Sequence, residues 1–549
     1  MLHKRRGRRL YTATYAILLI FTLALLSACG SGRGESATEP KIMVAALSQE
    51  PNHLNPILIS GMFFQDSVIR SMFSPLFRIR PDASIELILA AEIPTVANGL
   101  ISEDFLTYTI PLRTDALWSD GTPFTSADIK FSVERIQHPD VVPRTLVGFE
   151  KIASVETPDD HTVVFHLTEI YPPFISTLAK PDIIPKHIWE DVPPAEMNES
   201  PMNMEPKVTL GPFTFEEWVH GDHITVVKDP NYFNPAGVDK FVFRIMPDQN
   251  SILAALLRGD VHFYWFLPPE HQSIIEEDPN AFMALGDPPL WWEHIRMNFA
   301  NPSFDDVRVR QALNYSFDKD MLIEVARQGM GLAYGSPIGP ASWAYNEAVG
   351  PYPFDVDRAN QLLDEAGWVM GSDGVRHRDG ERLEFVYSTT AGNPWREQTQ
   401  RVLQDQWSNI GVEANIRNVD AATFFGTLLP SGKPGADVGG WDLSQFQTAL
   451  SWDPAEAIQQ QFHTRGNTNH GNYVNPRIDE LIALSNSTVV QDDRLVMFHE
   501  MAEIFHEDAA AVYLYIVIGG AGLGVEVDTY VHSSWDVYTW NIEQWSFPD

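Results

Sequence analysis

The stretch from Glu103 to Ile136, EDFLTYTIPLRTDALWSDGTPFTSADIKFSVERI, contains three local structural signals in succession. Apolar residues alternate with polar ones over 107–113, which is the period of a strand with one buried face. Residues 119–123, SDGTP, predict a tight turn because Asp and Gly accept turn dihedrals and Pro fixes its own. Thr125 is a good N-cap, and Asp128 three residues later completes a capping-box pair that predicts a helix. This stretch therefore predicts a strand, a turn and a helix.

The rest of the chain continues this mixture of strand and helix patterns. Alternating or apolar runs predict strands near 42–46, 162–167, 213–215, 223–227, 241–246, 383–388, 412–416 and 513–518. Amphipathic periods with caps predict helices near 251–257, 307–317, 355–366, 395–410, 478–484 and 495–505. Such an order favours mixed α/β lobes, and 549 residues exceed what one hydrophobic core usually supports.

The charge and the amino terminus indicate an exported chain. Acidic residues number 73 against 38 basic ones, which argues against nucleic-acid binding. A basic start, an apolar run over 16–26 and the tetrapeptide Leu-Ser-Ala-Cys ending at Cys29 are typical of a lipoprotein signal. We expect a signal peptide over 1–28, lipidation of Cys29 and a flexible tether over 29–40. The alternative, a transmembrane anchor, is disfavoured because the apolar run is short for a span.

Several segments of the chain resemble segments of one protein family, and they follow one another in the same order as in that family. They are LRTDALWSDGTPFTSADIKFSVERI (112–136), PNHLNPI (51–57), SMFSPLF (71–77), DDHTVVFHL (159–167), the block 211–262, FDDVRVRQALNYSFDK (304–319), FDVDRANQLLDEAGW (354–368) and QDQWSNIGVEANI (404–416). These segments resemble the family 5 extracellular solute-binding proteins, the peptide, dipeptide and nickel receptors of bacterial ABC importers. One departure is Leu210, which stands in the middle of the family's Gly-Thr-Gly-Pro loop and puts a ligand role for that loop in doubt.

The resemblance implies an architecture. It implies a two-lobed α/β fold of the periplasmic-binding-protein type II, with an extra subdomain in lobe 1 and a hinge between the lobes. The expected parts are lobe 1 over 41–71, 206–289 and 509–549, an inserted subdomain over 72–205, and lobe 2 over 290–508. Such lobes close around a ligand that lies between them.

The resemblance also implies a function without catalysis. We expect an extracytoplasmic, monomeric receptor that captures peptides and delivers them to an ABC permease, with an oligosaccharide as the alternative solute. No cofactor or metal is expected. A secreted hydrolase is the alternative from a different class, but the sequence has no Gly-x-Ser-x-Gly elbow, Walker loop or dinucleotide fingerprint. The nearest metal-like motif, His499-Glu500 with Glu503, lacks the second histidine and is more simply explained as an acidic, solvated helix face.

Aromatic residues are the candidate ligand contacts. Flat rings cover apolar side chains and sugar faces with little loss of entropy, although each ring alone is more often explained by core packing. By resemblance, the segments that border the cleft contain Tyr264, Trp265, Trp291, Trp292, Trp441, Trp452 and Asp453.

The residues around Asp453 bear on the choice of solute. Relatives that bind peptides place an aspartate shortly before an Asp-Pro or Glu-Pro pair, where it takes the ligand's amino group. Residues 448–452 before Asp453-Pro454 contain no acid, and Thr389-Thr390 offers no basic group for a carboxylate. We therefore expect binding that does not depend on a free amino terminus, with Trp441 and Trp452 carrying more of the affinity.

Overall fold

A computed structural model describes residues 40–58, 63–180, 183–265, 267–285, 291–435, 440–450, 452–533 and 536–548. Residues from Ile42 onward form one compact unit. The expected signal peptide, Cys29 and all of the tether but Pro40 lie outside the described residues. Within the described part of the chain, no helix is both long and apolar enough to cross a membrane.

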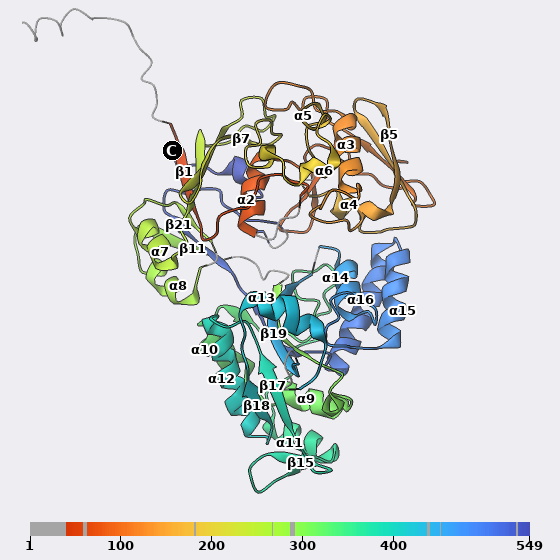
Figure 1. Cartoon of the computed structure of the whole chain (residues 1–549), viewed down its shortest axis with the longest axis vertical. Coiled ribbons are helices and arrows are strands. Elements are labelled where there is room, and N and C mark those ends of the chain that lie inside the picture. Colours follow the sequence, from red (N-terminus) through yellow and green to blue (C-terminus); the bar gives the residue numbers. More distant parts are fainter. Residues whose placement is uncertain are drawn as a thin grey trace, which may run out of the picture. The chain divides into compact units, whose positions relative to one another are not determined.

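Lobe 1 is built on a seven-stranded sheet with the order β11-β21-β10-β1-β9-β8-β7. Figure 1 labels β1, β7, β11 and β21 of this sheet. Its central strand β1 runs parallel to both neighbours and is almost wholly apolar, as a strand inside a covered sheet must be. Helix α7 covers part of it by packing Ile252 and Leu256 against Ala46. The elements are β1 (Ile42–Leu47), α2 (Phe63–Met72), β7 (Phe213–Val219), β8 (His223–Lys228), β9 (Lys240–Ile245), α7 (Gln249–Leu257), β10 (Phe263–Tyr264), α8 (Pro269–Glu276), β11 (Ala281–Leu285) and β21 (Gly520–Gly524).

The inserted part of lobe 1 carries its own three-stranded sheet, β4-β6-β5. The strand and helix predicted from 103–136 are confirmed as β4 and α3, and the Asp128 carboxylate accepts from the Thr125 N–H at 2.9 Å. The other carboxylate oxygen of Asp128 accepts from the Lys186 N–H, which ties α5 to the start of α3. The elements are β2 (Phe77–Ile79), β3 (Ile85–Leu87), β4 (Thr107–Pro111), α3 (Ser126–Ile136), β5 (Ile152–Asp159), β6 (Thr162–Leu167), α4 (Phe174–Thr177), α5 (Lys186–Trp189) and α6 (Pro194–Met197).

Lobe 2 is built on a six-stranded mixed sheet with the order β13-β20-β12-β19-β17-β18. Side chains of β12 alternate between two cores, because Ile295 packs among the side chains of α9 and α12 while Trp292 packs among those of α14 to α16. The strands are β12 (Trp291–Met297), β13 (Gly331–Leu332), β17 (Glu384–Ser388), β18 (Glu413–Ile416), β19 (Leu443–Ala449) and β20 (Val512–Val517), with β14 (Val369–Met370), β15 (Arg376–Arg378) and β16 (Glu381–Arg382) in a separate small sheet. The helices are α9 (Val307–Tyr315), α10 (Lys319–Arg327), α11 (Val356–Glu365), α12 (Pro394–Ser408), α13 (Ala421–Thr423), α14 (Pro454–Phe462), α15 (Pro476–Ser487) and α16 (Gln491–Glu507).

Two chain segments connect the sheets of the two lobes. In lobe 1 the antiparallel pair of β11 and β21 ends with Leu285 opposite Gly520, and in lobe 2 the pair of β12 and β20 includes Trp292 opposite Ile516. The connections therefore run through 286–290, which are outside the described residues, and through 518–519. Strand β20 follows residue 508 and pairs with β12 in the sheet of lobe 2. The expected lobe bounds, which assign 509–549 to lobe 1, are therefore kept only as a prediction.

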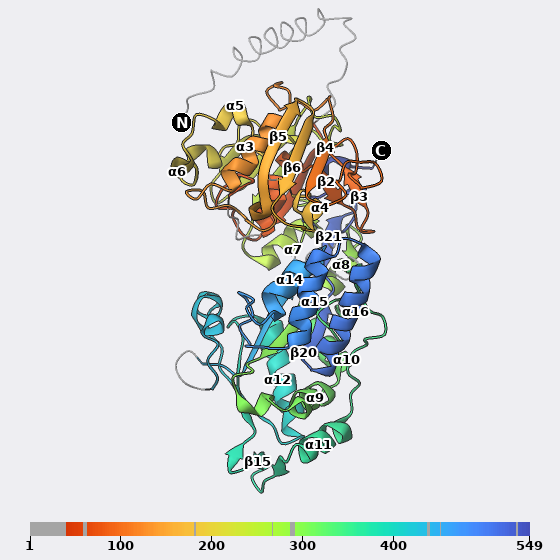
Figure 2. The same ribbon diagram turned by 90° about the vertical axis from the view of Figure 1, so that its right-hand side faces the viewer.

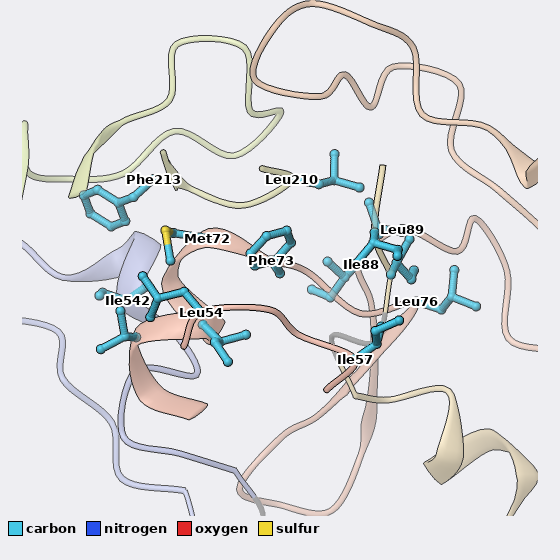
Figure 3. Packing of buried hydrophobic residues seen from close by; sticks show 14 of the residues in the cluster. Leu54, Ile57, Met72, Phe73, Leu76, Ile88, Leu89, Leu210, Phe213 and Ile542 are labelled. Carbon is cyan, nitrogen blue, oxygen red and sulfur yellow. The ribbon is translucent and has the colours of Figure 1, made fainter. Parts of the chain in front are cut away.

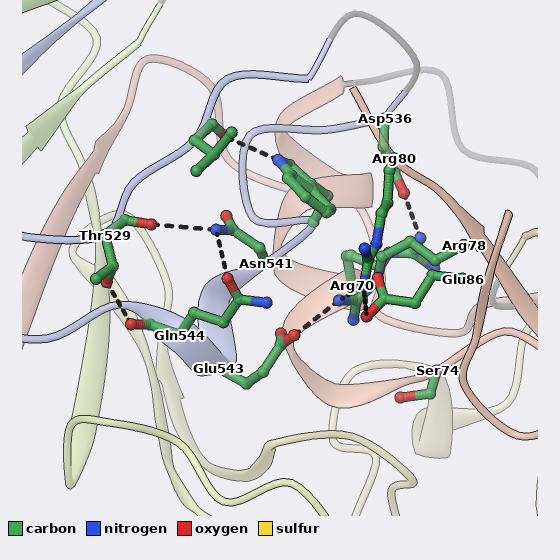
Figure 4. A network of polar contacts seen from close by, with 12 residues as sticks. Arg70, Ser74, Arg78, Arg80, Glu86, Thr529, Asp536, Asn541, Glu543 and Gln544 are labelled. Carbon is green, nitrogen blue, oxygen red and sulfur yellow. Dashed lines mark hydrogen bonds and ion pairs between the residues drawn. The ribbon is translucent and has the colours of Figure 1, made fainter. Parts of the chain in front are cut away.

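Two packing arrangements hold the separate segments of lobe 1 together. Leu210 and Phe213 meet Met72, Phe73 and the C-terminal Ile542 in one core (Figure 3). Buried arginines of α2 and β2 pair with the C-terminal segment, Arg70 with Asp536 and Arg78 with Glu543 (Figure 4). Ile542 and Trp545 of the C-terminal segment are thus part of the lobe 1 core.

Candidate functional site: a pocket between the inserted segment and helices α14 and α15

The inserted part of lobe 1 faces α14 and α15 of lobe 2 (Figure 2). A pocket of about 510 Å³ is lined by residues of both. Its volume is within the range of small-molecule sites. It is lined by Val147, Glu150, Lys151, Glu169, Ile170 and Tyr171 from the inserted part and by Glu456, Gln459, Gln460, Ala483, Asn486 and Ser487 from lobe 2.

The first wall is organised around the ring of Tyr171. Gly148 lies beside it with a φ of +83°, and a Cβ at this position would lie 2.4 Å from the Thr177 Oγ1 and 3.0 Å from Cε1 of Tyr171. Only glycine leaves room for the tyrosine and threonine side chains together. Burial and the carboxylate of Glu456 raise the pKa of Tyr171, so its hydroxyl stays protonated. On the same wall Lys151 is paired with Glu169.

The second wall is the first two turns of α14 with the end of α15. Gln460 donates to Glu456 Oε1 at 2.9 Å, and Asn486 Nδ2 donates to Gln459 Oε1 at 2.7 Å. Burial raises the pKa of Glu456, and the neighbouring Glu150 and Asp453 act in the same direction. The wall therefore presents amide groups and one acid whose charge is disfavoured.

Asp453, a predicted ligand residue, is engaged inside lobe 2. Its carboxylate caps α14 by accepting from the Ala455 N–H at 3.1 Å. It also accepts two hydrogen bonds from Arg494 of α16, at 2.5 and 2.7 Å, with both side chains about 95 % buried or more. A buried bidentate pair of this kind fixes the loop before α14 instead of offering a free charge to a solute.

A second buried polar group lies on β12, next to β19. Glu293 of β12 accepts from Arg396 Nε at 2.8 Å and from Gln445 Nε2 at 3.0 Å. Arg396 also donates to Thr390 Oγ1 at 3.0 Å. The sequence predicted no basic group at Thr390, and the structure brings Arg396 there from the first turn of α12, already neutralised by Glu293.

The predicted aromatic contacts do not converge on one surface. Trp441, Trp292 and Tyr264 are at most 1 % exposed, and they pack in three different hydrophobic clusters. Trp292 stacks on His294 at 3.9 Å between ring centroids, and Tyr264 shares a hydrogen bond with His271. None of the predicted aromatic residues lines the pocket.

The remaining predicted aromatic residues keep some exposure. Trp265 is half-buried against Phe64 and Tyr538, Trp452 is half-buried, and Trp291 is 37 % exposed. Sequence reasoning missed Tyr171 because its Tyr-Pro-Pro-Phe run indicates only a loop. It missed Glu456, Gln459 and Asn486 because polar residues on a helix are usually solvated.

Two α/β lobes joined by two crossings, with a pocket where they face each other, define a solute-binding protein of the two-lobed type. The sequence model of the bacterial extracellular solute-binding proteins, family 5, matches residues 91–469. The chain belongs to this family. The proteins of this family to which it is similar are solute-binding proteins and not enzymes.

Relatives match along nearly the whole chain. The chain is 26 % identical over 556 residues to the oligopeptide-binding protein AppA of Bacillus subtilis, covering 98 % of this chain and 99 % of AppA. It is 27 % identical over 510 residues to the glutathione-binding protein GsiB of Salmonella typhimurium, covering 90 % and 92 %. The solved structure of B. subtilis AppA with a nonapeptide superposes with a TM-score of 0.75 at 25 % identity, over 93 % of this chain and all of that one. The substrate-binding protein CtaP of Listeria monocytogenes superposes with a TM-score of 0.82 at 21 % identity, over 93 % and 100 %, which bears on the fold alone.

Proposed function

We propose that this chain is the extracytoplasmic receptor of an ABC importer, anchored by a lipid at Cys29, and that as a monomer it captures peptides and delivers them to the permease. The observation that carries the proposal is the full-length similarity to an oligopeptide-binding protein together with a pocket between the inserted part of lobe 1 and lobe 2. The relative named for glutathione, itself a peptide, supports the same solute class. Trp452 and Trp291 remain proposed contacts, while the buried Trp292 would support the second wall, because it packs in the same cluster as Ile458 and Phe462 of α14.

Peptide capture is tested with a defined probe. Purified protein is incubated with a tryptic casein hydrolysate, separated from unbound material by gel filtration, and denatured so that retained peptides are identified by mass spectrometry. We expect a subset of peptides to be retained in near-stoichiometric amount and unchanged in sequence. Newly shortened peptides would favour the hydrolase alternative.

A neutral oligosaccharide is the second candidate solute. The amide side chains of Gln459, Gln460 and Asn486 could bond hydroxyl groups as well as peptide groups. Cellohexaose offered under the same conditions separates the two. Retention of the sugar without any casein peptide would contradict the peptide proposal.

The lipid anchor is tested at Cys29. The Cys29→Ala variant should be released from membranes, because stable anchoring depends on the acyl chains that this cysteine would carry. Expression in a lipoprotein-processing bacterium, followed by membrane fractionation and detergent-free washing, measures the outcome. A variant that stays in the membrane fraction would contradict the anchor.

A further inference from the structure

We propose that Tyr171 of the inserted segment is a specificity-determining ligand contact, and that it holds a neutral, internal segment of a peptide against the amide groups of Gln459 and Asn486. This inference rests on the proposed function and names the part of the peptide that is read. It makes the inserted part of lobe 1 a wall of the binding site.

Tyr171 is held firmly where it faces the pocket. Its ring packs partly buried against the lobe 1 core, and its carbonyl accepts from the Phe174 N–H at 3.1 Å as α4 begins. Thr177 and the Tyr171 ring both lie beside Gly148, which has no side chain and leaves the space that the two side chains occupy. A ring fixed in this way loses little entropy when a solute packs on it.

The opposite wall matches one peptide group. Asn486 donates one N–H of its side-chain amide to Gln459 Oε1. The carbonyl oxygen of Asn486 can then accept a hydrogen bond from a solute, and the NH₂ group of Gln459 can donate one. A peptide unit offers one N–H and one C=O, so it complements this pair. The amides of Asn486 and Gln459 would thus bind the main-chain N–H and C=O of the peptide, whatever side chain that residue carries.

The charges near the pocket do not favour the ends of a peptide. Asp453 is paired with Arg494, and Lys151 is paired with Glu169. Burial raises the pKa of Glu456, and the side chain of Glu150 in the lining is exposed to solvent. An internal peptide segment is neutral and meets donors, acceptors and an aromatic ring without needing a counter-ion.

The test compares four variants with the casein peptide retained most strongly. Tyr171→Ala should raise the dissociation constant of this peptide about tenfold or more, which is the scale of one aromatic contact. Tyr171→Phe should change it much less, because the ring and not the hydroxyl makes the proposed contact. Gly148→Ala should reproduce the loss of Tyr171→Ala, since its Cβ would displace the ring although Gly148 itself does not line the pocket. Tyr345→Ala, at a half-buried tyrosine outside the pocket, is the matched control and should bind as the wild type does.

The same peptide with an acetylated amino end and an amidated carboxyl end tests whether the protein binds an internal, neutral segment and not the charged ends. Its affinity should stay within about threefold of the free peptide. A loss of about thirtyfold on blocking, or a Tyr171→Ala variant that binds like the wild type, would overturn the inference and leave the proposed function standing. If the wild type retains no casein peptide, the proposed function fails and this inference fails with it. Melting curves of every variant separate loss of binding from loss of folding.

Discussion

Position 211 carries no side chain, and this lets two distant segments touch. A Cβ on Gly211 would lie 2.4 Å from the carbonyl carbon and 2.7 Å from the carbonyl oxygen of Met72. The neighbouring Leu210 donates its N–H to that oxygen at 3.0 Å. The loop that departs from the family pattern at Leu210 therefore has a structural role in joining α2 to the start of β7, whatever its role toward a ligand.

Gly211→Ala should lower the free energy of unfolding by about 1–3 kcal/mol, because the backbone of Met72 cannot yield as a flexible side chain would. Chemical denaturation at neutral pH measures the change. Gly350→Ala is the matched control, since a Cβ at that position would have no atom within 4 Å and its φ is not positive. Equal destabilisation by the two variants would contradict the close-approach argument.

Lys319 is a buried cation without a carboxylate partner among the described residues. Its Nζ donates to the Asn314 and Tyr352 carbonyl oxygens at 2.9 and 3.0 Å. Burial lowers the pKa of Lys319 from 10.5 to about 7. Between these values the unfolded chain binds a proton that the folded chain does not, so this residue makes the free energy of unfolding rise with pH.

The Lys319→Met variant should lack this pH dependence. The free energy of unfolding of the variant minus that of the wild type should be largest below pH 7. This difference should fall steadily toward pH 10.5, where the wild-type lysine carries no penalty. Urea denaturation at a series of pH values gives the difference curve. A constant offset between the two proteins across this range would show that Lys319 titrates normally.

Helices and strands differ in how much of their structure the sequence discloses. Helix α3 was predictable because Thr125 and Asp128, three residues apart, form its cap locally. The partner of Asp453 lies 41 residues away on α16, and no local pattern reveals it. The apolar pattern of β20 predicts a strand and leaves its sheet undecided. Buried Trp441 and exposed Trp291 look alike in sequence because an aromatic ring suits a core or a cleft equally.

The pair of Asp453 and Arg494 links the start of α14 to α16 and tests whether Asp453 is structural. Asp453→Asn and Arg494→Met should each cost about 3–5 kcal/mol of stability, since each leaves a buried charge alone. The double variant should cost clearly less than the sum of the two. Thermal and urea unfolding measure these values. The exposed pair of Arg477 and Glu500, 2.7 Å apart, is the control and should show little coupling.

Additive costs at Asp453 and Arg494 would mean that the two side chains do not act as a pair. Asp453 would then be available to a solute, and the expectation of binding without a free amino terminus would lose its structural support. The cycle thus connects one ion pair in lobe 2 to the chemistry of the solute.

At the scale of the molecule, the two sheets are connected by two segments that continue antiparallel strand pairs. The pairing passes from Leu285 and Gly520 in one sheet to Trp292 and Ile516 in the other. Gly519 lies in the second connection with no atom within 4 Å of a Cβ position, so its backbone can rotate without a clash. Two connections between the lobes allow rotation of one lobe against the other while they limit sliding.

Closure on a solute is the prediction that follows. A peptide between Tyr171 and α14 makes all of its contacts only when both walls are near, so it favours the closed form. To convert a nearly all-open population to a nearly all-closed one, the peptide must bind the closed form about 10⁴-fold more tightly. Small-angle scattering should therefore show a smaller radius of gyration with the retained casein peptide than without it. A peptide that the protein does not retain is the control, and an unchanged radius at saturation would mean that binding and lobe closure are not coupled.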